Sequence, residues 1–204
     1  MSINGFNGTP FGLEADGYGQ TQELIACMIA GVRTALPVRV VSVTNSGAAA
    51  PIGRVDIQPL VGQLDGRGKH VDHGTIYNVP YLRIQGGQNA IIIDPAVGDI
   101  GIAVFCDRDI SGVKRGRRTA PPASSRKHDM SDAIYLHSVL SAAPSQYIAF
   151  QNGGIVIKSP NAITIDAPNV AIAGGSLTHN GVNIGSSHVH GGIAPGPATT
   201  STPR

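Results

Sequence analysis

The sequence predicts a mainly β protein with one N-terminal helix, a small barrel and a C-terminal array of short strands. The 204 residues include 27 Gly and 14 Pro but no Trp, which is typical of many short strands joined by turns. One helical stripe of apolar residues comes first, and segments of alternating hydrophobicity follow it. Pairs of aliphatic residues then recur every seven or eight positions toward the C-terminus.

The N-terminal region divides into an extension and a helix. Residues 1–19 are rich in Gly and Asn and predict an extension without regular structure. They lack the charged and apolar regions of a signal peptide. Residues 20–36 follow with an apolar stripe at helical spacing, made of Leu24, Ile25, Met28, Ile29, Val32 and Leu36. We expect an amphipathic helix that Pro37 ends, and that docks on the barrel or on the same helix of neighbouring subunits.

Residues 37–143 are expected to form the barrel. Their extended segments are 37–45, 55–61, 74–84, 90–93 and 100–106. Five strands joined by long turns predict a small barrel. A barrel that binds nucleic acid would present aromatic side chains in a basic groove, whereas Tyr77 and Tyr81 have few cations nearby. With a net charge of +2, we therefore expect a structural platform and no nucleic-acid partner.

Several polar residues of this region could be mistaken for catalytic or metal-ligating sets. The aspartates at strand ends are Asp94, Asp99, Asp107 and Asp109. Carboxylates in such turns more often cap the backbone than act in catalysis. His70 and His73 lie in a loop without a third ligand at motif spacing, which favours solvated histidines. Cys27 and Cys106 have apolar neighbours, and we expect two buried, reduced thiols.

A basic segment covers residues 114–128. Its cations are Lys114, Arg115, Arg117, Arg118, Arg126, Lys127 and His128. Such a patch can contact DNA or lipid headgroups. A solvated connector between the barrel and the C-terminal array is favoured, and pairing with acidic groups of neighbouring subunits is a further alternative.

Residues 144–187 carry aliphatic pairs whose members are two positions apart, so both side chains leave the same face of a strand. The pairs are Ile155/Ile157, Ile163/Ile165, Val170/Ile172 and Val182/Ile184, with Leu177 between the last two. Such a strip cannot enclose a core alone. Three copies wound about one axis bring three aliphatic side chains inward at each level and pair every strand edge. The segment therefore predicts a homotrimeric stalk.

His188 and His190 end this strip and keep the same spacing of two, which directs both imidazoles toward the axis. Three chains then bring six ring nitrogens together. Six ligands suit an octahedral ion such as Fe(II), Ni(II) or Co(II), whereas structural zinc prefers four. The alternative is that both histidines lie in a polar tail and bind nothing. The strand array before them and the Gly and Pro residues after them favour a metal-binding apex over residues 188–204.

The residues of this apex carry a resemblance to a known family. The tail NIGSSHVHGGIAPGPATTSTPR resembles the tip of the central spike proteins of contractile phage tails. The segments 94–111 and 124–136 are similar to the N-terminal oligonucleotide/oligosaccharide-binding (OB) barrel of the membrane-puncturing spikes. The resemblance implies an OB-fold barrel followed by an intertwined trimeric β-helix. It also implies one iron ion per trimer, held by His188 and His190 of three chains, with further ions allowed along the stalk axis.

The same resemblance implies a structural role and no enzymatic activity. The expected protein is a homotrimeric central spike at the tail baseplate tip of a virion, assembled in the host cytoplasm. It contacts tail tube and baseplate hub proteins and pierces the host outer membrane when the tail contracts. The alternative is a trimeric tail-fibre or adhesin module that binds a cell-surface receptor. The small residues of the terminus suit a cap better than a specific adhesive surface.

Overall fold

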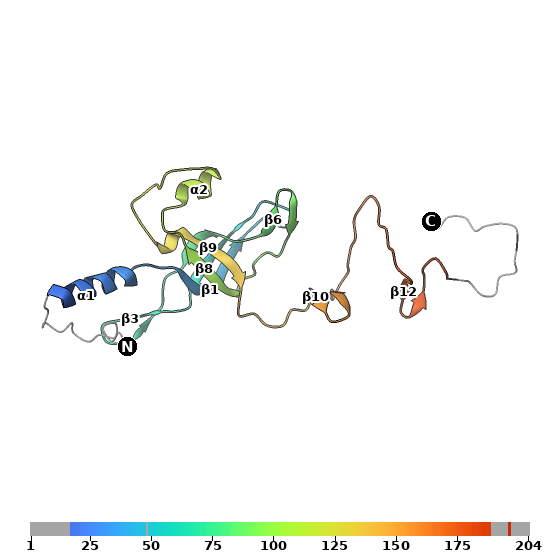
Figure 1. The fold of residues 1–204 in the computed structure, drawn as a ribbon, viewed down its shortest axis with the longest axis horizontal. Helices are drawn as coiled ribbons and strands as arrows, with labels where there is room; N and C mark the ends of the chain where they lie inside the picture. Colours follow the sequence, from blue (N-terminus) through green and yellow to red (C-terminus); the bar gives the residue numbers. More distant parts are fainter. Residues whose placement is uncertain (1–16, 48, 189–195, 197–204) are drawn as a thin grey trace. The chain divides into compact units, whose positions relative to one another are not determined.

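The computed structural model describes residues 17–47, 49–188 and 196. The chain divides into two compact units, Met1–Ala143 and Pro144–Arg204. Most of the regular structure is β, with few helices (Figure 1). Within the described residues, no helix is both long enough and apolar enough to cross a membrane.

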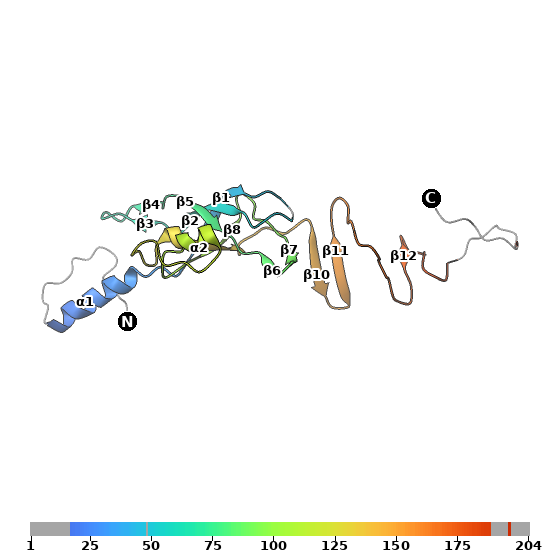
Figure 2. The same cartoon turned by 90° about the horizontal axis from the view of Figure 1, so that it is seen from above.

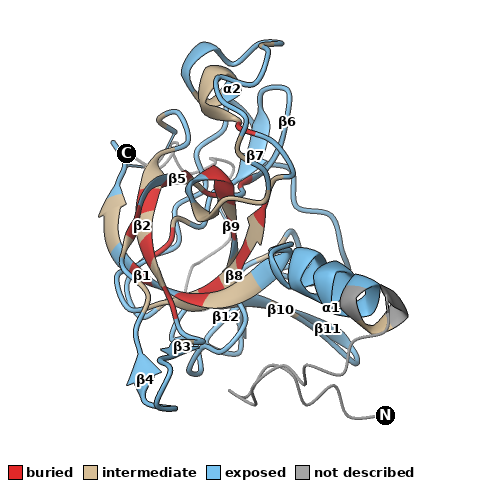
Figure 3. Ribbon diagram, turned by 90° about the vertical axis from the view of Figure 1, so that its left-hand side faces the viewer, coloured by how far each residue is buried: buried red, intermediate tan, exposed pale blue. Residues whose placement is uncertain are grey.

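Helix α1 extends from Gly17 to Ala30 and ends six residues before the predicted end at Leu36. The prediction was wrong here because strand β1 (Ala35–Thr44) recruits Leu36, which pairs with Ala103 and packs against the core. The apolar stripe of α1 is exposed, and α1 is drawn as exposed in Figure 3. Its docking on neighbouring copies stays a prediction. Cys27 is exposed on this helix, so the expectation that it is buried was also wrong.

A five-stranded antiparallel sheet forms the body of the first unit. Its strands are β1, β2 (Arg54–Pro59), β5 (Ile76–Pro80), β8 (Ile100–Phe105) and β9 (Ala133–Ser138). The order across the sheet is β5-β2-β1-β8-β9, so β1 lies at the centre and pairs with both β2 and β8. Pro37 is tolerated in β1 because its carbonyl oxygen still accepts a hydrogen bond, from Leu60 N at 2.9 Å.

The sheet curls until its two edges meet. Tyr81, directly after β5, forms a parallel bridge with Tyr135 of β9. Leu82 N donates to the carbonyl oxygen of Tyr135 over 2.9 Å. Register shifts in the β1–β2, β2–β5 and β8–β9 pairs mark bulges, which bend strands and increase their twist. The result is a barrel-like sheet whose buried residues line its interior (Figure 3).

The core inside this sheet consists of buried residues from the five strands and of Tyr81, directly after β5. Its members are Val38, Val40, Val55, Ile57, Ile76, Val79, Tyr81, Ala103, Phe105, Ala133 and Tyr135. The strand predicted at 90–93 is not one of the barrel strands. Strand β7 (Asn89–Ile91) pairs instead with β6 (Ile84–Gly86) in an exposed hairpin, and β9 supplies the fifth barrel strand.

The basic segment lies in the connection between β8 and β9. It begins within the short helix α2 (Ser111–Gly116) and ends before the 3₁₀ turn η2 (Met130–Asp132). The interpretation of this segment as a connector between barrel and stalk was therefore wrong. The reason is that β9 returns to pair with β8, so the segment is a connection within the barrel unit. A further hairpin of β3 (Gln63–Leu64) and β4 (His70–Val71) extends from the same unit.

The described part of the second unit contains two hairpins. Strand β10 (Tyr147–Gln151) pairs with β11 (Gly154–Lys158), as Figure 2 shows, and β12 (Thr178–His179) pairs with β13 (Val182–Asn183). An Asn-Gly turn with positive φ at both residues joins β12 to β13, which is the preferred two-residue hairpin loop. The aliphatic pairs predicted from the sequence all have exposed side chains in the single chain.

Candidate functional site

One of the two predicted metal ligands lies within the described residues. His188 follows the β12–β13 hairpin and is exposed, whereas His190 lies outside the described residues. The Nδ1 atom of His188 is 2.7 Å from the carbonyl oxygen of Gly185. A carbonyl oxygen only accepts hydrogen bonds, so a neutral His188 makes this contact as the Nδ1–H tautomer. This tautomer is the one that a backbone carbonyl commonly fixes in metal-binding histidines.

The turn that carries His188 is held by local hydrogen bonds. The side chain of Asn183 accepts from Gly185 N at 2.9 Å and donates to Ser187 Oγ at 2.9 Å. Ile184 N donates to the carbonyl oxygen of Leu177 over 2.8 Å. The residues before His188 therefore position its imidazole. In the described part of the chain, no three His, Cys, Asp or Glu residues come together as a metal site, so the predicted shared site stays a prediction.

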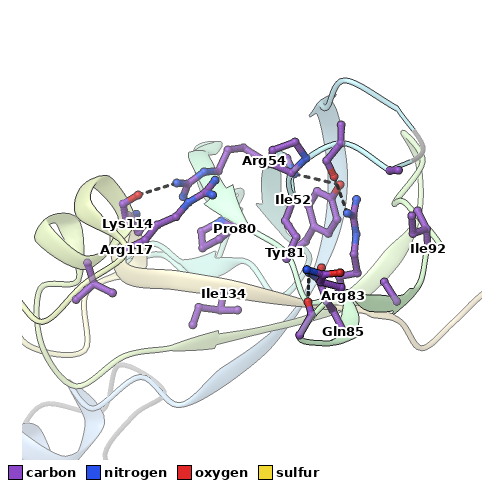
Figure 4. Close-up of a pocket in the computed structure, with 18 of the residues that line it drawn as sticks. Ile52, Arg54, Pro80, Tyr81, Arg83, Gln85, Ile92, Lys114, Arg117 and Ile134 are labelled. Atoms are coloured by element: carbon purple, nitrogen blue, oxygen red, sulfur yellow. Dashed lines mark hydrogen bonds between the residues drawn. The ribbon is translucent and has the colours of Figure 1, made fainter.

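The first unit has a groove of about 1010 Å³ that the sequence did not predict (Figure 4). Its walls come from the β1–β2 connection, from the chain around β6 and β7, and from α2. Four cationic side chains line it, and no carboxylate does; the cations are Arg54, Arg83, Lys114 and Arg117. Apolar wall residues include Ile52, Pro80 and Ile134.

One end of this groove is neutralised by Asp94. Tyr81 Oη donates to Asp94 Oδ1 over 2.7 Å, and Arg83 Nη2 lies 3.0 Å from the same oxygen. Arg83 Nη1 also donates to the carbonyl oxygen of Ala50 at 2.8 Å, and the Arg83 side chain is only 5% exposed. The hydrogen bond from Tyr81 and then the contacts with Arg83 lower the pKa of Asp94 despite its partial burial. This cluster ties the β1–β2 connection to the closing edge of the sheet.

The other end of the groove carries positive charge without a lining carboxylate. Arg54 Nη2 donates to the carbonyl oxygen of Lys114 over 3.0 Å. Arg54 Nη1 is buried and has no hydrogen-bond partner within the described residues. Lys114 Nζ donates to the carbonyl oxygen of Ser131 at 3.0 Å. Burial lowers the pKa of Lys114, and the nearby charge of Arg54 acts in the same direction. Arg117, directly after α2, completes this end.

Beside the groove, Arg126 joins two buried aspartates. Its Nε lies 2.8 Å from Asp132 Oδ2, and its Nη2 lies 2.8 Å from Asp109 Oδ1. Asp109 also accepts hydrogen bonds from Ser111 N and Ser111 Oγ, and from Ser124 Oγ at 2.7 Å. These bonds lower the pKa of Asp109 to about 2, with those from Ser111 as the main cause. The network anchors the connection between β8 and β9.

The structure also shows the surroundings of Asp99, His70 and Cys106, which were named from the sequence. Asp99 Oδ2 accepts from Ala96 N at 2.9 Å and caps its turn, as predicted. His70 lies in β4, exposed, with Nε2 3.6 Å from Asp72 Oδ1. Cys106 is half-buried, and burial raises the pKa of its thiol, so the thiol is protonated at neutral pH.

Arg54 and Arg83 were not identified from the sequence. The available signal was an Arg beside apolar residues in or next to a predicted strand, in the sequences GRVDI and YLRI. Such an arginine is expected to be paired or functional when the strand is buried. Its partners, however, come from distant parts of the chain, as in the bond between Arg54 and Lys114, which are 60 positions apart.

Comparison with known families finds one match. Residues 36–138 match the model of the family described as "Phage protein Gp138 N-terminal domain", which is half of the chain. The matched range runs from the second residue of β1 to the last residue of β9 and so covers the whole barrel-like sheet. Comparison with curated proteins found no match.

Proposed function

The chain belongs to the family of the phage protein Gp138 N-terminal domain, and on this premise we propose that it is the central spike of a contractile phage tail. Family membership makes it a phage structural protein and a component of the virion. In our proposal the spike is a homotrimer at the baseplate tip. It attaches to tail tube and hub proteins and is driven through the host outer membrane when the tail contracts. Its action is mechanical and changes no bond in a substrate.

The observation that carries this proposal is the exposure of the aliphatic pairs in the second unit. In the single chain Ile165 is 71% exposed and Ile172 is 68% exposed. Full burial of one Ile or Val side chain is worth roughly 1.5–3 kcal/mol, and three wound copies would bury the pairs at every level. A regular series of exposed pairs therefore supports a stalk in which each chain provides one third of the interior.

The topology of the first unit supports an OB-fold platform. The five barrel strands in chain order are β1, β2, β5, β8 and β9. Strand β1 pairs with β2 and β8, and β8 also pairs with β9. The parallel bridge between Tyr81 and Tyr135 connects the end of β5 to β9, the two edges of the sheet. This is the pairing order of a five-stranded OB barrel. Such a barrel gives the spike a rigid body for attachment.

We place an iron ion at the tip, held by His188 and His190 of three chains. Imidazole nitrogens suit Fe(II), as they suit Ni(II) and Co(II), and a backbone carbonyl such as that of Gly185 beside His188 Nδ1 is a common partner of ligating histidines. When bound, the ion supplies a cross-link between chain ends. The chain itself positions the ligands, because the turn before His188 is held by Asn183.

A direct test replaces both histidines with alanine. We expect the purified wild-type protein to be a trimer of 21.0 kDa chains with one metal ion per three chains. The variant His188→Ala/His190→Ala should lose the metal and remain a trimer, because the aliphatic pairs still associate. His179→Ala is the matched control, since His179 is an exposed histidine in β12 and should leave the metal content unchanged. Elemental analysis and native mass spectrometry measure both quantities; a monomer, or a trimer without stoichiometric metal, contradicts the proposal.

Virions assembled with the same double variant separate the spike from the adhesin alternative. A spike with a weakened tip should adsorb to cells at the wild-type rate but lose infectivity after adsorption. An adhesin with a damaged end should lose adsorption itself. Adsorption kinetics and plaque titres on the same preparation distinguish the two outcomes.

A further inference from the structure

The groove of the first unit holds more positive charge than its own residues neutralise. Of its four lining cations, Arg83 is paired with Asp94. The three others, Arg54, Lys114 and Arg117, gather at the opposite end in Figure 4. The nearby Asp109 and Asp132 share one cation, Arg126, and the charge of Asp132 also acts on Lys114, although neither aspartate lines the groove. Counting Arg126, four cations face two carboxylates among the described residues, and this excess of positive charge favours a bound anion.

The guanidinium of Arg54 gives the strongest indication. Its Nη2 atom donates to the carbonyl oxygen of Lys114, but its Nη1 atom is buried without a hydrogen-bond partner in the described part of the chain. Buried donors in folded proteins are rarely left unpaired. Arg also presents its donors as a fork that fits the two oxygens of a carboxylate or phosphate.

The surroundings restrict what this anion belongs to. Single-stranded nucleic acid needs exposed aromatic faces for stacking. The aromatic residue in the lining, Tyr81, is buried and hydrogen-bonded to Asp94, so it offers no such face. A bilayer attracts basic groups that reach its surface, whereas Arg54 and Lys114 are partly buried in the wall of the groove. The ligand must therefore enter the groove.

We propose that the end of the groove formed by Arg54, Lys114 and Arg117 binds an oxyanion, and that its source is the carboxylate of an acidic polypeptide segment from a partner protein. The groove is much larger than a single carboxylate or phosphate. Ile52, Pro80 and Ile134 contribute apolar wall next to the cations. This combination fits a segment in which acidic and aliphatic side chains alternate. Free phosphate shares the charge chemistry but uses none of the apolar wall.

The site goes beyond the proposed spike function and does not rest on it. It needs only the first unit, whose sheet encloses its own core. The trimeric stalk and the metal tip involve the second unit, so failure of either would leave this inference intact.

Two probes test the site on the full-length protein. The first is a short fluorescein-labelled peptide of alternating Glu and Leu, followed by fluorescence polarisation. The second is inorganic phosphate, titrated calorimetrically and used as a competitor of the peptide. A Lys and Leu peptide of the same length controls for apolar binding. We expect saturable binding of the acidic peptide, weaker binding of phosphate, and none of the basic peptide.

Charge-removing variants locate the binding. Arg117→Gln removes an exposed cation of the groove, and Arg54→Gln removes the guanidinium whose Nη1 atom is buried. Each should raise the Kd of the acidic peptide about tenfold or more, since each removes a charge-assisted hydrogen bond. Arg115→Gln is the matched control, because Arg115 is an exposed cation of α2 outside the groove lining, and it should change the Kd less than about twofold. Arg117→Gln keeps the test valid if Arg54→Gln fails to fold.

The outcomes separate the sources of the anion. Tight peptide binding that depends on Arg117 and Arg54 supports the proposal in full. Phosphate binding with the same dependence, at equal or greater affinity than the peptide, supports the oxyanion site but overturns the polypeptide as its source. Absence of binding by both probes overturns the site. Equal weakening by Arg115→Gln also overturns it, because the attraction would then be a property of the whole basic surface.

Discussion

Arg126 holds the long connection between β8 and β9 to the sheet. It contacts Asp109 near the start of the connection and Asp132 near its end, and both carboxylates are about 1% exposed. A buried carboxylate is costly to desolvate unless it is paired and hydrogen-bonded. Because one guanidinium pairs with both aspartates, the connection has a defined conformation, which in turn places Lys114 and Arg117 at the groove.

We expect Arg126→Met to destabilise the first unit clearly, because it leaves two buried carboxylates without their cation. Lys127→Met is the matched control, since it removes the same charge from the next, exposed position. The melting temperature measured by circular dichroism should fall by several degrees for Arg126→Met and stay nearly constant for the control. Equal melting temperatures for the two variants would show that the network contributes nothing to stability.

The low pKa of Asp109 predicts a loss of stability in acid. Its pKa falls from the ordinary 3.8 to about 2 in the folded protein, so the unfolded chain takes up the proton first as the pH decreases. The stabilisation is therefore complete above about pH 4 and is lost as the pH falls through about 2. The lowered pKa values of Asp94 and Asp129 act in the same direction.

Urea unfolding at a series of pH values between 5 and 2 should measure this loss. Asp109→Asn should unfold more easily at pH 5 and show a smaller decrease between pH 4 and 2, because it removes one of the titrating groups. An unchanged decrease in that variant would assign the acid sensitivity to other carboxylates.

At the scale of elements, the pairing of β8 with β9 decides how the sheet curls. The register of this pair shifts between Gly101 and Ala103. A Cβ atom at Gly101 would overlap the carbonyl oxygen of His137 and the ring of Tyr135. The strand can therefore approach its partner only because position 101 has no side chain.

Gly101→Ala should destabilise the first unit by about 1–3 kcal/mol, the usual cost of overpacking. Gly86→Ala is the matched control, since Gly86 also lies in a strand but a Cβ atom there would meet nothing within 4 Å. Chemical denaturation of the two variants measures the difference. A Gly101→Ala protein as stable as the control would mean that the sheet relaxes freely at the bulge.

At the scale of the whole molecule, the two units obtain their stability differently. The first unit buries eleven apolar residues within its own sheet. In the second unit the aliphatic pairs stay exposed in a single chain, so their burial requires other copies. The unfolding of the first unit should consequently be independent of protein concentration, whereas that of the second should depend on it.

Single tryptophan reporters can test this difference, because the natural chain contains no Trp. Phe150→Trp reports on β10 in the second unit, and Tyr77→Trp reports on an exposed position of β5 in the first. The thermal midpoint reported by Phe150→Trp should rise with protein concentration, and the midpoint reported by Tyr77→Trp should stay constant. A constant midpoint for both reporters would contradict assembly through the second unit.

The pattern of residues along the chain predicted the class of the fold and the spacing of the aliphatic pairs in the second unit. The composition and the alternating segments predicted a mainly β chain, as the structure shows. Spacing along one strand also revealed the aliphatic pairs and the placement of His188 after them. These features are local, since they depend on side chains a few positions apart, which is why a sequence pattern reveals them.

Only the tertiary structure decided where elements end and which charges meet. Leu36 continues the helical stripe by spacing, but its pairing with Ala103 places it in β1. Ile91 has the alternation of a barrel strand, yet pairing with Ile84 in the β6–β7 hairpin keeps it outside the core. Arg54 and Lys114 meet across 60 positions of chain. In each case a long-range contact outweighs the local preference, because pairing and burial in the folded sheet contribute more free energy than a helical or alternating pattern does alone.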